Sequence, residues 1–185
     1  SFPFKTPLGF SVDCGRYAEN VEAADALADR GGFAARRAAS KAAGRLRGQG
    51  FACFLESARG APEEGAEIRF AEDGMIEVRV GTESNGQGHE TVFSRLVAER
   101  LGAPLAEIRY IQADTRETRM GHGHGGARSM HMGGRAIVGA IDAALEKGRT
   151  VAAGLLQADA GAVSFRDGAF VAGDGRSVAL ADVAA

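Results

Sequence analysis

The stretch AEIRFAEDGMIEVRVG, residues 66–81, predicts a β-hairpin and is the clearest local indication of the fold. Apolar side chains alternate with charged ones on both sides of Asp73-Gly74, a dipeptide that supplies positive φ in tight turns. The apolar residues of this pattern are Ile68, Phe70, Ile76, Val78 and Val80. Alternation with a period of two predicts that one face of each strand packs on a core and the other is exposed.

The sequence after the hairpin predicts a helix and then another strand. Four apolar residues recur at helical spacing, and a glycine and a proline then end the helix. The apolar residues are Phe93, Leu96, Val97 and Leu101, and the terminating residues are Gly102 and Pro104. The stretch EIRYIQA, residues 107–113, predicts a return to a strand.

The C-terminal part predicts a long helix and a small hairpin. The helical region spans about Ser129 to Asp159, and we expect an interruption near Gly148. The hairpin covers Val163 to Val171 and turns at Asp167-Gly168. Because helices and strands are mixed without strict βαβ alternation, the predicted class is α+β, a mixed sheet with hairpins packed by helices.

The start of the chain differs in character from the rest. Residues 1–17 indicate an extended arm, and helices are expected over Glu19–Arg30 and Phe33–Ala43. The stretch LRGQGFACFLES, residues 46–57, predicts a buried strand because it is rich in apolar and aromatic residues.

The chain has 185 residues and shows no internal repeat or linker, so we expect a single unit over residues 1–185. In that unit, residues 1–44 form the extended arm and helices, and residues 45–185 form the core. The formal net charge of −2 gives no electrostatic case for nucleic acid or an anionic membrane as the main partner. Two cysteines, Cys14 and Cys53, are too few for a disulfide scaffold, which favours a reducing, cytoplasmic compartment.

Two glycine-containing loops are candidates for chemistry. The first, NGQGHET over residues 85–91, lies between the end of a strand and the start of a helix. Helix N-termini expose unpaired N–H groups, and flanking glycines let a ligand approach the backbone closely. Gln87 adds a neutral side chain that both donates and accepts, suited to an oxo group or the edge of a heterocycle. A tight turn with Gln87 in solvent explains the same pattern equally well.

The second loop, GHGHGGARS over residues 121–129, also leads into a helix. It formally satisfies G-x-G-x-x-G, with Asp142 or Glu146 roughly where a ribose-binding acid is found. Residues 114–120 separate it from the preceding strand, which disfavours the geometry of a Rossmann fold. Glycines beside a helix N-terminus nevertheless remain suited to holding a phosphate.

The histidines of the chain suggest a metal site as an alternative. All four lie in or beside the two loops, at His89, His122, His124 and His131. A zinc site needs three or four ligands with oriented hydrogen-bond partners, and a flexible glycine loop fixes neither. We therefore favour histidines that form hydrogen bonds over a zinc site, and assign no metal ligand.

Several motifs, in this order and at this spacing, resemble one family. They are GTESNGQGHET, ADT, GHGHGGARS, GGRAI and FRDGAFVAGDGRSVAL. The chain is similar to the large, molybdopterin-binding subunit of the molybdenum hydroxylases, the group of xanthine dehydrogenase, aldehyde oxidase and aerobic carbon monoxide dehydrogenase. The resemblance is strong from about Arg45 to the end, and FSVDCGRY and GFAARRAASKAAGRLRGQG look like the family's preceding segment. It implies a fragment of a molybdopterin-binding domain.

The resemblance implies cofactor-binding residues in both loops. One match is to the family's Gly-Gln-Gly loop, which contacts molybdopterin, and the other is to the loop that wraps the pterin and pyrophosphate. The residues are Gly86, Gln87, Gly88 and His89 in the first, and Gly123, His124, Gly125, Gly126, Ala127, Arg128 and Ser129 in the second. In bacterial relatives the cofactor is usually the cytosine dinucleotide form. The family often has Thr at His122 and His124 and Ser at Ala127, so one or two hydroxyl contacts are replaced here.

Other parts of the family's active site have no counterpart in this chain. These are the glycine-rich loop beside the metal, the active-site loop that distinguishes subfamilies and the general-base glutamate, so no catalytic residue is assigned and the fragment is expected to be inactive alone. The resemblance implies part of an oxidoreductase that hydroxylates an aldehyde, N-heterocycle or similar small substrate with water-derived oxygen, or oxidises carbon monoxide. Its partners would be the rest of the large subunit and iron–sulfur and FAD domains or subunits. The alternative is a stand-alone nucleotide- or metal-binding module without redox activity.

Overall fold

The computed structural model describes residues 2–55, 62–118 and 120–185. Its contacts divide the chain into two compact units, Ser1–Leu55 and Glu56–Ala185, called here the N-terminal unit and the core unit. The sequence predicted one unit, with the core beginning at residue 45. Each unit is described below by itself.

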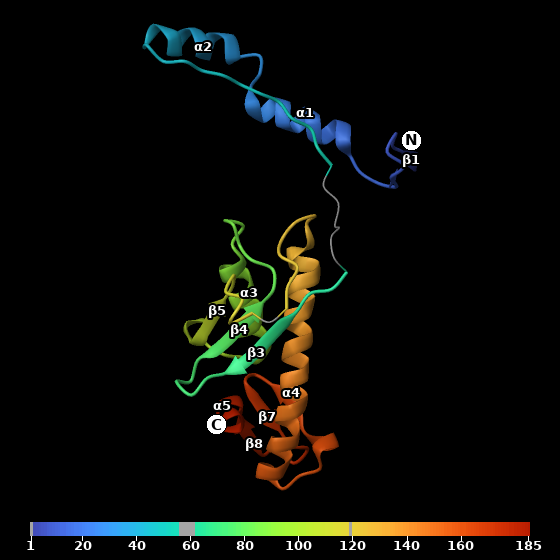
Figure 1. Ribbon diagram of the computed structural model, residues 1–185, viewed down its shortest axis with the longest axis vertical. Helices are drawn as coiled ribbons and strands as arrows, with labels where there is room; N and C mark the ends of the chain where they lie inside the picture. The colour runs from blue at the N-terminus through green and yellow to red at the C-terminus, as the bar shows by residue number, and fades with distance from the viewer. Residues whose placement is uncertain (1, 56–61, 119) are drawn as a thin grey trace. The chain divides into compact units, whose positions relative to one another are not determined.

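The N-terminal unit contains a short ladder and two helices (Figure 1). Strands β1 (Phe4–Lys5) and β2 (Ser11–Val12) pair antiparallel within the predicted arm. The two predicted helices are confirmed as α1 (Tyr17–Ala28) and α2 (Phe33–Ala42). Opposite charges join the end of α1 to α2, because Arg36 forms an ion pair with Asp29.

The buried strand predicted over residues 46–57 is wrong for the residues that can be assessed, and residues 56 and 57 lie outside the described part. Residues 46–55 have no regular secondary structure, and Leu46 and Phe54 are 99% and 83% exposed. A strand is stabilised by hydrogen bonds to a neighbour, and apolar composition alone does not supply that neighbour. Among the described residues of the N-terminal unit, Ser40 alone is buried.

The core unit is organised around a three-stranded sheet in the order β3-β4-β5 (Figure 1). The hairpin prediction is confirmed by β3 (Ala66–Phe70) and β4 (Ile76–Val80), which pair antiparallel with Ile68 opposite Val78. The positive φ predicted for the turn dipeptide is found at Gly74, which has a φ of +82°, but not at Asp73. The predicted strand over residues 107–113 is confirmed as β5 (Ile108–Ile111), parallel to β4.

Two helices pack on this sheet. The predicted helix after the hairpin is α3 (His89–Leu101), which ends at Gly102 in the left-handed conformation. The long helix α4 (Arg135–Leu156) is preceded by a π-helical turn, η2 (Ser129–Gly134).

The interruption expected near Gly148 is wrong, because α4 is continuous through this residue. A Cβ at Gly148 would lie 2.6 Å from Cζ of Phe170, a side chain that is 0% exposed. The glycine therefore makes room for an aromatic ring instead of ending the helix. The irregular part of the helical region is its N-terminal turn, η2.

The C-terminal segment folds against the end of α4. The predicted hairpin is confirmed by β6 (Ser164–Arg166) and β7 (Ala169–Val171), with positive φ at both Asp167 and Gly168. A third strand, β8 (Ser177–Ala179), and a short helix, α5 (Leu180–Ala184), complete the unit. Two short 3-10 helices, η1 (Leu105–Glu107) and η3 (Ala160–Ala162), precede β5 and β6.

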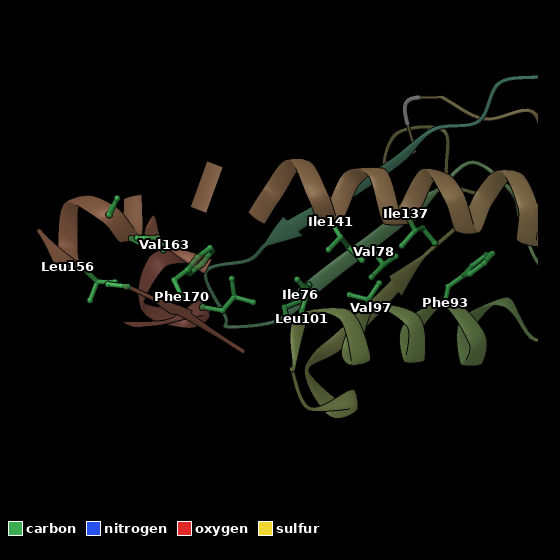
Figure 2. Close-up of a cluster of buried hydrophobic side chains, with 14 of the residues drawn as sticks. Ile76, Val78, Phe93, Val97, Leu101, Ile137, Ile141, Leu156, Val163 and Phe170 are labelled. Carbon is green, nitrogen blue, oxygen red and sulfur yellow. The ribbon is translucent and has the colours of Figure 1, made fainter. Parts of the chain in front are cut away.

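Buried apolar side chains from these elements form one cluster along α4 (Figure 2). Figure 2 shows Ile137 and Ile141 of α4 and Val97 of α3 converging on Val78 of β4. Helices packed on a small mixed sheet beside a three-stranded antiparallel sheet confirm the predicted α+β class. The described residues contain no helix that is both long and apolar enough to cross a membrane.

Candidate functional site

The two candidate loops lie side by side because two glycines touch. We define the first loop as residues 81–88, between β4 and α3, and the second loop as residues 120–128, before η2. A Cβ on Gly81 would overlap Cα of Gly121, and a Cβ on Gly121 would overlap Cα of Gly81. Gly81 also donates its N–H to the carbonyl oxygen of Gly65, at 3.0 Å. Only residues without a side chain allow the two backbones to approach this closely.

A buried threonine at the base of the first loop joins it to the start of the α4 region. Thr82 is 0% exposed, and its Oγ1 lies 3.1 Å from Oγ of Ser129, the first residue of η2. A Cβ on Gly133 would lie 2.5 Å from Cγ2 of Thr82, so the π-helical turn packs directly on this side chain. Tyr110 of β5 donates its hydroxyl proton to the Thr82 carbonyl oxygen. The bases of the two loops are therefore fixed to the sheet and to each other.

Gln87 folds back onto its own loop. Its Oε1 accepts hydrogen bonds from the Asn85 N–H at 2.6 Å and the Ser84 hydroxyl at 3.2 Å. Its Nε2 donates to the carbonyl oxygen of Glu83 at 3.4 Å. The side chain is exposed and organises the first loop, and its predicted contact with a cofactor stays a prediction.

The glycines beside Gln87 give the first loop its shape. Gly86 has a φ of +117° and Gly88 has a φ of +83°, a region in which residues with a side chain are strained. Both are exposed, and a Cβ at either would meet no described atom within 4 Å. The loop thus presents open backbone at the N-terminus of α3, where N–H groups and a partial positive charge favour an anionic ligand.

The side chain of His89 lies in the interior, not on the loop surface. It is 5% exposed, and its ring centroid lies 4.9 Å from that of Phe93. Burial lowers the pKa of His89, which favours the neutral ring at pH 7. Neither ring nitrogen has a hydrogen-bond partner among the described residues. The ring is therefore not available on the surface, and only the backbone of His89, at the start of α3, could contact a ligand there. Its predicted role in cofactor binding stays a prediction.

The second loop is dominated by left-handed backbone. Positive φ values occur at Gly123, Gly125, Gly126 and Ala127. Ala127 is the one residue of this run that carries a Cβ, and its carbonyl oxygen lies 3.0 Å from Nδ1 of His131. A Cβ at Gly125 would meet nothing within 4 Å, so this loop also has an open side.

Arg128 holds the second loop to the segment before β3. Its side chain is 2% exposed, and it forms an ion pair with Glu64, whose side chain is 0% exposed. The same guanidinium donates to the carbonyl oxygen of Gly123, at 2.7 Å, and to that of Glu63. Glu64 was not predicted from the sequence, because nothing in the sequence links two residues 64 positions apart. The guanidinium points into the protein, so Arg128 shapes the loop from within.

His124 contacts two residues of the first loop. Its Nδ1 lies 3.1 Å from Oε1 of Glu83, and its Nε2 lies 2.9 Å from Nδ2 of Asn85. The pKa of Glu83 is held below its usual range by its own backbone N–H and by the hydrogen bond from His124. Glu83 and Asn85 were also missed from sequence, although they stand in the motif GTESNGQGHET.

The exposed Gln87 agrees with the alternative of a tight turn in the first loop, whereas the second loop does not have the geometry of a Rossmann fingerprint. β5 ends at Ile111, well before the second loop, and that loop leads into a π-helical turn instead of directly into an α-helix. Across residues 2–55, 62–118 and 120–185, no group of three or more His, Cys, Asp or Glu side chains is placed to hold a metal ion.

The donors present fit a pterin that carries a pyrophosphate. Open glycine backbone lies at the N-terminus of α3 and before η2, and both positions offer N–H groups to phosphate oxygens. Gln87 offers an amide to the edge of a heterocycle.

Comparison with known proteins identifies the family. The family model described as the molybdopterin cofactor-binding domain matches residues 24–185. The chain belongs to this family. Its predicted resemblance to the large subunit of molybdenum hydroxylases is confirmed. The match includes part of the N-terminal unit as well as all of the core unit.

Individual relatives agree with this assignment. The chain is 33% identical to the carbon monoxide dehydrogenase large chain of Hydrogenophaga pseudoflava, over 84% of this chain and 21% of the relative. It is 29% identical to the nicotine 6-hydroxylase large subunit of Paenarthrobacter nicotinovorans, over 99% of this chain and 24% of the relative. A crystal structure of a copper- and molybdenum-containing carbon monoxide dehydrogenase superposes with a TM-score of 0.65 at 26% identity, covering 98% of this chain and 25% of that chain. The chain thus spans about a fifth to a quarter of the length of these relatives.

Proposed function

We propose that the two loops bind the molybdopterin cofactor of a molybdenum-dependent oxidoreductase, in its cytosine dinucleotide form. The observation that carries this proposal is the contact between Gly81 and Gly121, which brings both motif loops to one place. Each loop alone is a short motif of low specificity. Their juxtaposition beside two helix N-termini supplies the donors that a pterin with a pyrophosphate requires.

The residues of this chain bind and orient the cofactor. The N–H groups of the first turn of α3 and of η2 hold anionic oxygens, and the positive-φ glycines keep side chains out of their way. Gln87 reaches the cofactor from the exposed side of the first loop, and Arg128 keeps the second loop in place from the interior. When bound, the cofactor supplies the redox centre of the reaction.

The reaction we propose for the whole enzyme is hydroxylation of a small substrate with water-derived oxygen, or oxidation of carbon monoxide. The substrate classes are an aldehyde, an N-heterocycle or a similar small molecule. The general-base glutamate belongs to other parts of the large subunit, so this chain alone is expected to be inactive. Electrons leave through iron–sulfur and FAD groups on partner domains or subunits, and we expect the assembly to be cytoplasmic.

The test is Gln87→Ala in the complete large subunit, with released pterin measured per protein. We expect retained pterin to fall several-fold, because the substitution removes the amide and the three hydrogen bonds that shape the first loop. Gln49→Ala is the matched control, since this exposed glutamine lies in the N-terminal unit and should leave pterin content unchanged. Equal pterin content in the Gln87→Ala variant and the parent protein would contradict the assignment.

A further inference from the structure

His124 connects the two loops through both nitrogens of its ring. The Nδ1 atom lies 3.1 Å from Glu83 Oε1, and the Nε2 atom lies 2.9 Å from Asn85 Nδ2. The two partners flank Ser84 in the first loop, whereas His124 lies in the second. A single side chain thus joins the two loops, in addition to the buried ion pair of Arg128 with Glu64 that holds the second loop from within.

One tautomer of the imidazole satisfies both contacts. The Asn85 amide nitrogen has hydrogens and no lone pair to offer, so Nε2 accepts. Nδ1 then carries the ring proton and donates it to the Glu83 carboxylate. The lowered pKa of Glu83 agrees with this arrangement, because an ionised carboxylate is the better acceptor.

The backbone next to His124 is built to allow this approach. Gly123 has a φ of +70°, and a Cβ there would lie 3.3 Å from Oε2 of Glu83, tighter than ordinary van der Waals contact. A Cβ at this position would require the Glu83 carboxylate to shift by a few tenths of an ångström, and the positive φ would strain any residue with a side chain. Gly123 thus allows the left-handed backbone of the second loop and also leaves room for the Glu83 carboxylate of the first loop.

Asn85 passes the effect of His124 on to Gln87. The Asn85 N–H donates to Gln87 Oε1 at 2.6 Å, while the Asn85 side chain is held by the His124 ring. Both ends of Asn85 are therefore fixed, one by each loop. Releasing the His124 end frees one of the three residues that hold the Gln87 amide.

We propose that His124, with Glu83 and Asn85, is a positioning residue that holds Gln87 in the orientation needed to bind the cofactor. This inference rests on the proposed function of the two loops. His124 itself acts through Asn85 and is not a catalytic residue. Asn85 and His124 are exposed and Glu83 is partly exposed, so their role is to fix the loops and not to stabilise the fold.

The test compares His124→Ala with His122→Ala in the complete large subunit. His122 lies on the same loop, is exposed, and makes no hydrogen bond or ion pair with any residue that the structure describes. We expect His124→Ala to raise amide hydrogen exchange at Asn85 and Gly86 about tenfold, since two hydrogen bonds are lost. We expect retained pterin to fall in the same variant, with the thermal unfolding midpoint unchanged. His122→Ala should leave both the exchange at Asn85 and Gly86 and the thermal unfolding midpoint unchanged.

Variants of Glu83 show whether the hydrogen bond is responsible. Glu83→Gln keeps an oxygen that accepts from Nδ1, so exchange in the first loop should stay close to that of the parent protein. Glu83→Ala removes the acceptor and should resemble His124→Ala, and combining the two alanine substitutions should add little to either. Unchanged exchange at Asn85 and Gly86 in the His124→Ala variant would overturn the inference.

The exchange measurement is made on cofactor-free protein, so it does not depend on the proposed function. A parent protein that holds no pterin would refute the proposed function, whatever the exchange rates show. A parent protein that holds pterin, together with a His124→Ala variant that keeps both its pterin and its slow exchange, would refute the positioning role alone.

Discussion

The interior of the core unit and its loop face are held together by different contacts. The interior is closed by apolar side chains of β4, α3, α4 and β7 (Figure 2). The loop face is closed by a contact between two glycines, an internal ion pair and hydrogen bonds through Gln87 and His124. The difference indicates that substitutions in the interior reduce stability, whereas most substitutions in the loops change what the face binds.

The largest effect should follow Phe170→Ala. This ring is 0% exposed and packs against Phe165 and the open side of Gly148. We expect a loss of about 3–5 kcal/mol in the free energy of unfolding, the usual range for a buried phenylalanine. Urea unfolding monitored by pulse proteolysis of the complete subunit measures it. A loss below about 1 kcal/mol would mean that this end of α4 is not part of a tightly packed interior.

An effect of similar size on the loop face should follow Arg128→Met. The substitution leaves the carboxylate of Glu64 buried without its guanidinium, a change that typically costs about 3–5 kcal/mol. Adding Glu64→Gln removes the buried charge and should recover part of the stability. Unlike Phe170→Ala, Arg128→Met should also release pterin, measured well below the unfolding midpoint. Full pterin retention in the Arg128→Met variant would contradict the claim that contacts of the loop face control cofactor binding.

Two glycines of α4 provide a matched pair with opposite expected signs. Gly148→Ala places a methyl 2.6 Å from Cζ of Phe170, and overpacking of this kind costs about 1–3 kcal/mol. Gly154 lies in the same helix, and a Cβ there meets no atom within 4 Å, so Gly154→Ala should stabilise by about 0.5–1 kcal/mol. Thermal unfolding of the two variants measures the difference. If both substitutions changed the stability in the same direction, Gly148 would not be needed to make room for the Phe170 ring.

The smallest effect concerns pH and the buried ring of His89. Burial lowers the pKa of His89 in the folded state below the value of 6.5 for an unperturbed histidine. As pH falls below about 6.5, the unfolded chain takes up a proton that the folded protein does not, so stability decreases at up to about 1.4 kcal/mol per pH unit. His89→Leu should flatten this dependence. An unchanged slope between pH 7 and pH 5 in the variant would show that His89 is protonated equally in both states.

Local patterns predicted the elements whose formation depends on neighbouring residues. The hairpin of β3 and β4 and the helix α3 follow from alternation, helical spacing and turn residues that lie within a few positions of each other. The strand expected over residues 46–57 failed because burial requires a partner that composition does not reveal. The continuity of α4 at Gly148 likewise depends on Phe170, which belongs to a different element.

Only part of the candidate site could be predicted, again because contacts between residues far apart in the sequence leave no local pattern. Family resemblance indicated the two loops and their glycines, but no rule based on spacing joins Gly81 to Gly121 or Glu64 to Arg128. The contacts of His124 with Glu83 and Asn85 form only because folding brings the two loops together. Sequence motifs thus identified which segments form the site, and the three-dimensional contacts identified how they are held.

The most direct test of cofactor binding by this protein is the cofactor content of the complete large subunit, produced in cells grown with molybdate. Molybdenum, zinc, released pterin and released cytidine monophosphate are measured per protein. We expect molybdenum, pterin and cytidine monophosphate in amounts close to one per subunit. A well-folded subunit that contains zinc alone, or no cofactor, would contradict this expectation and favour a binding module without redox activity.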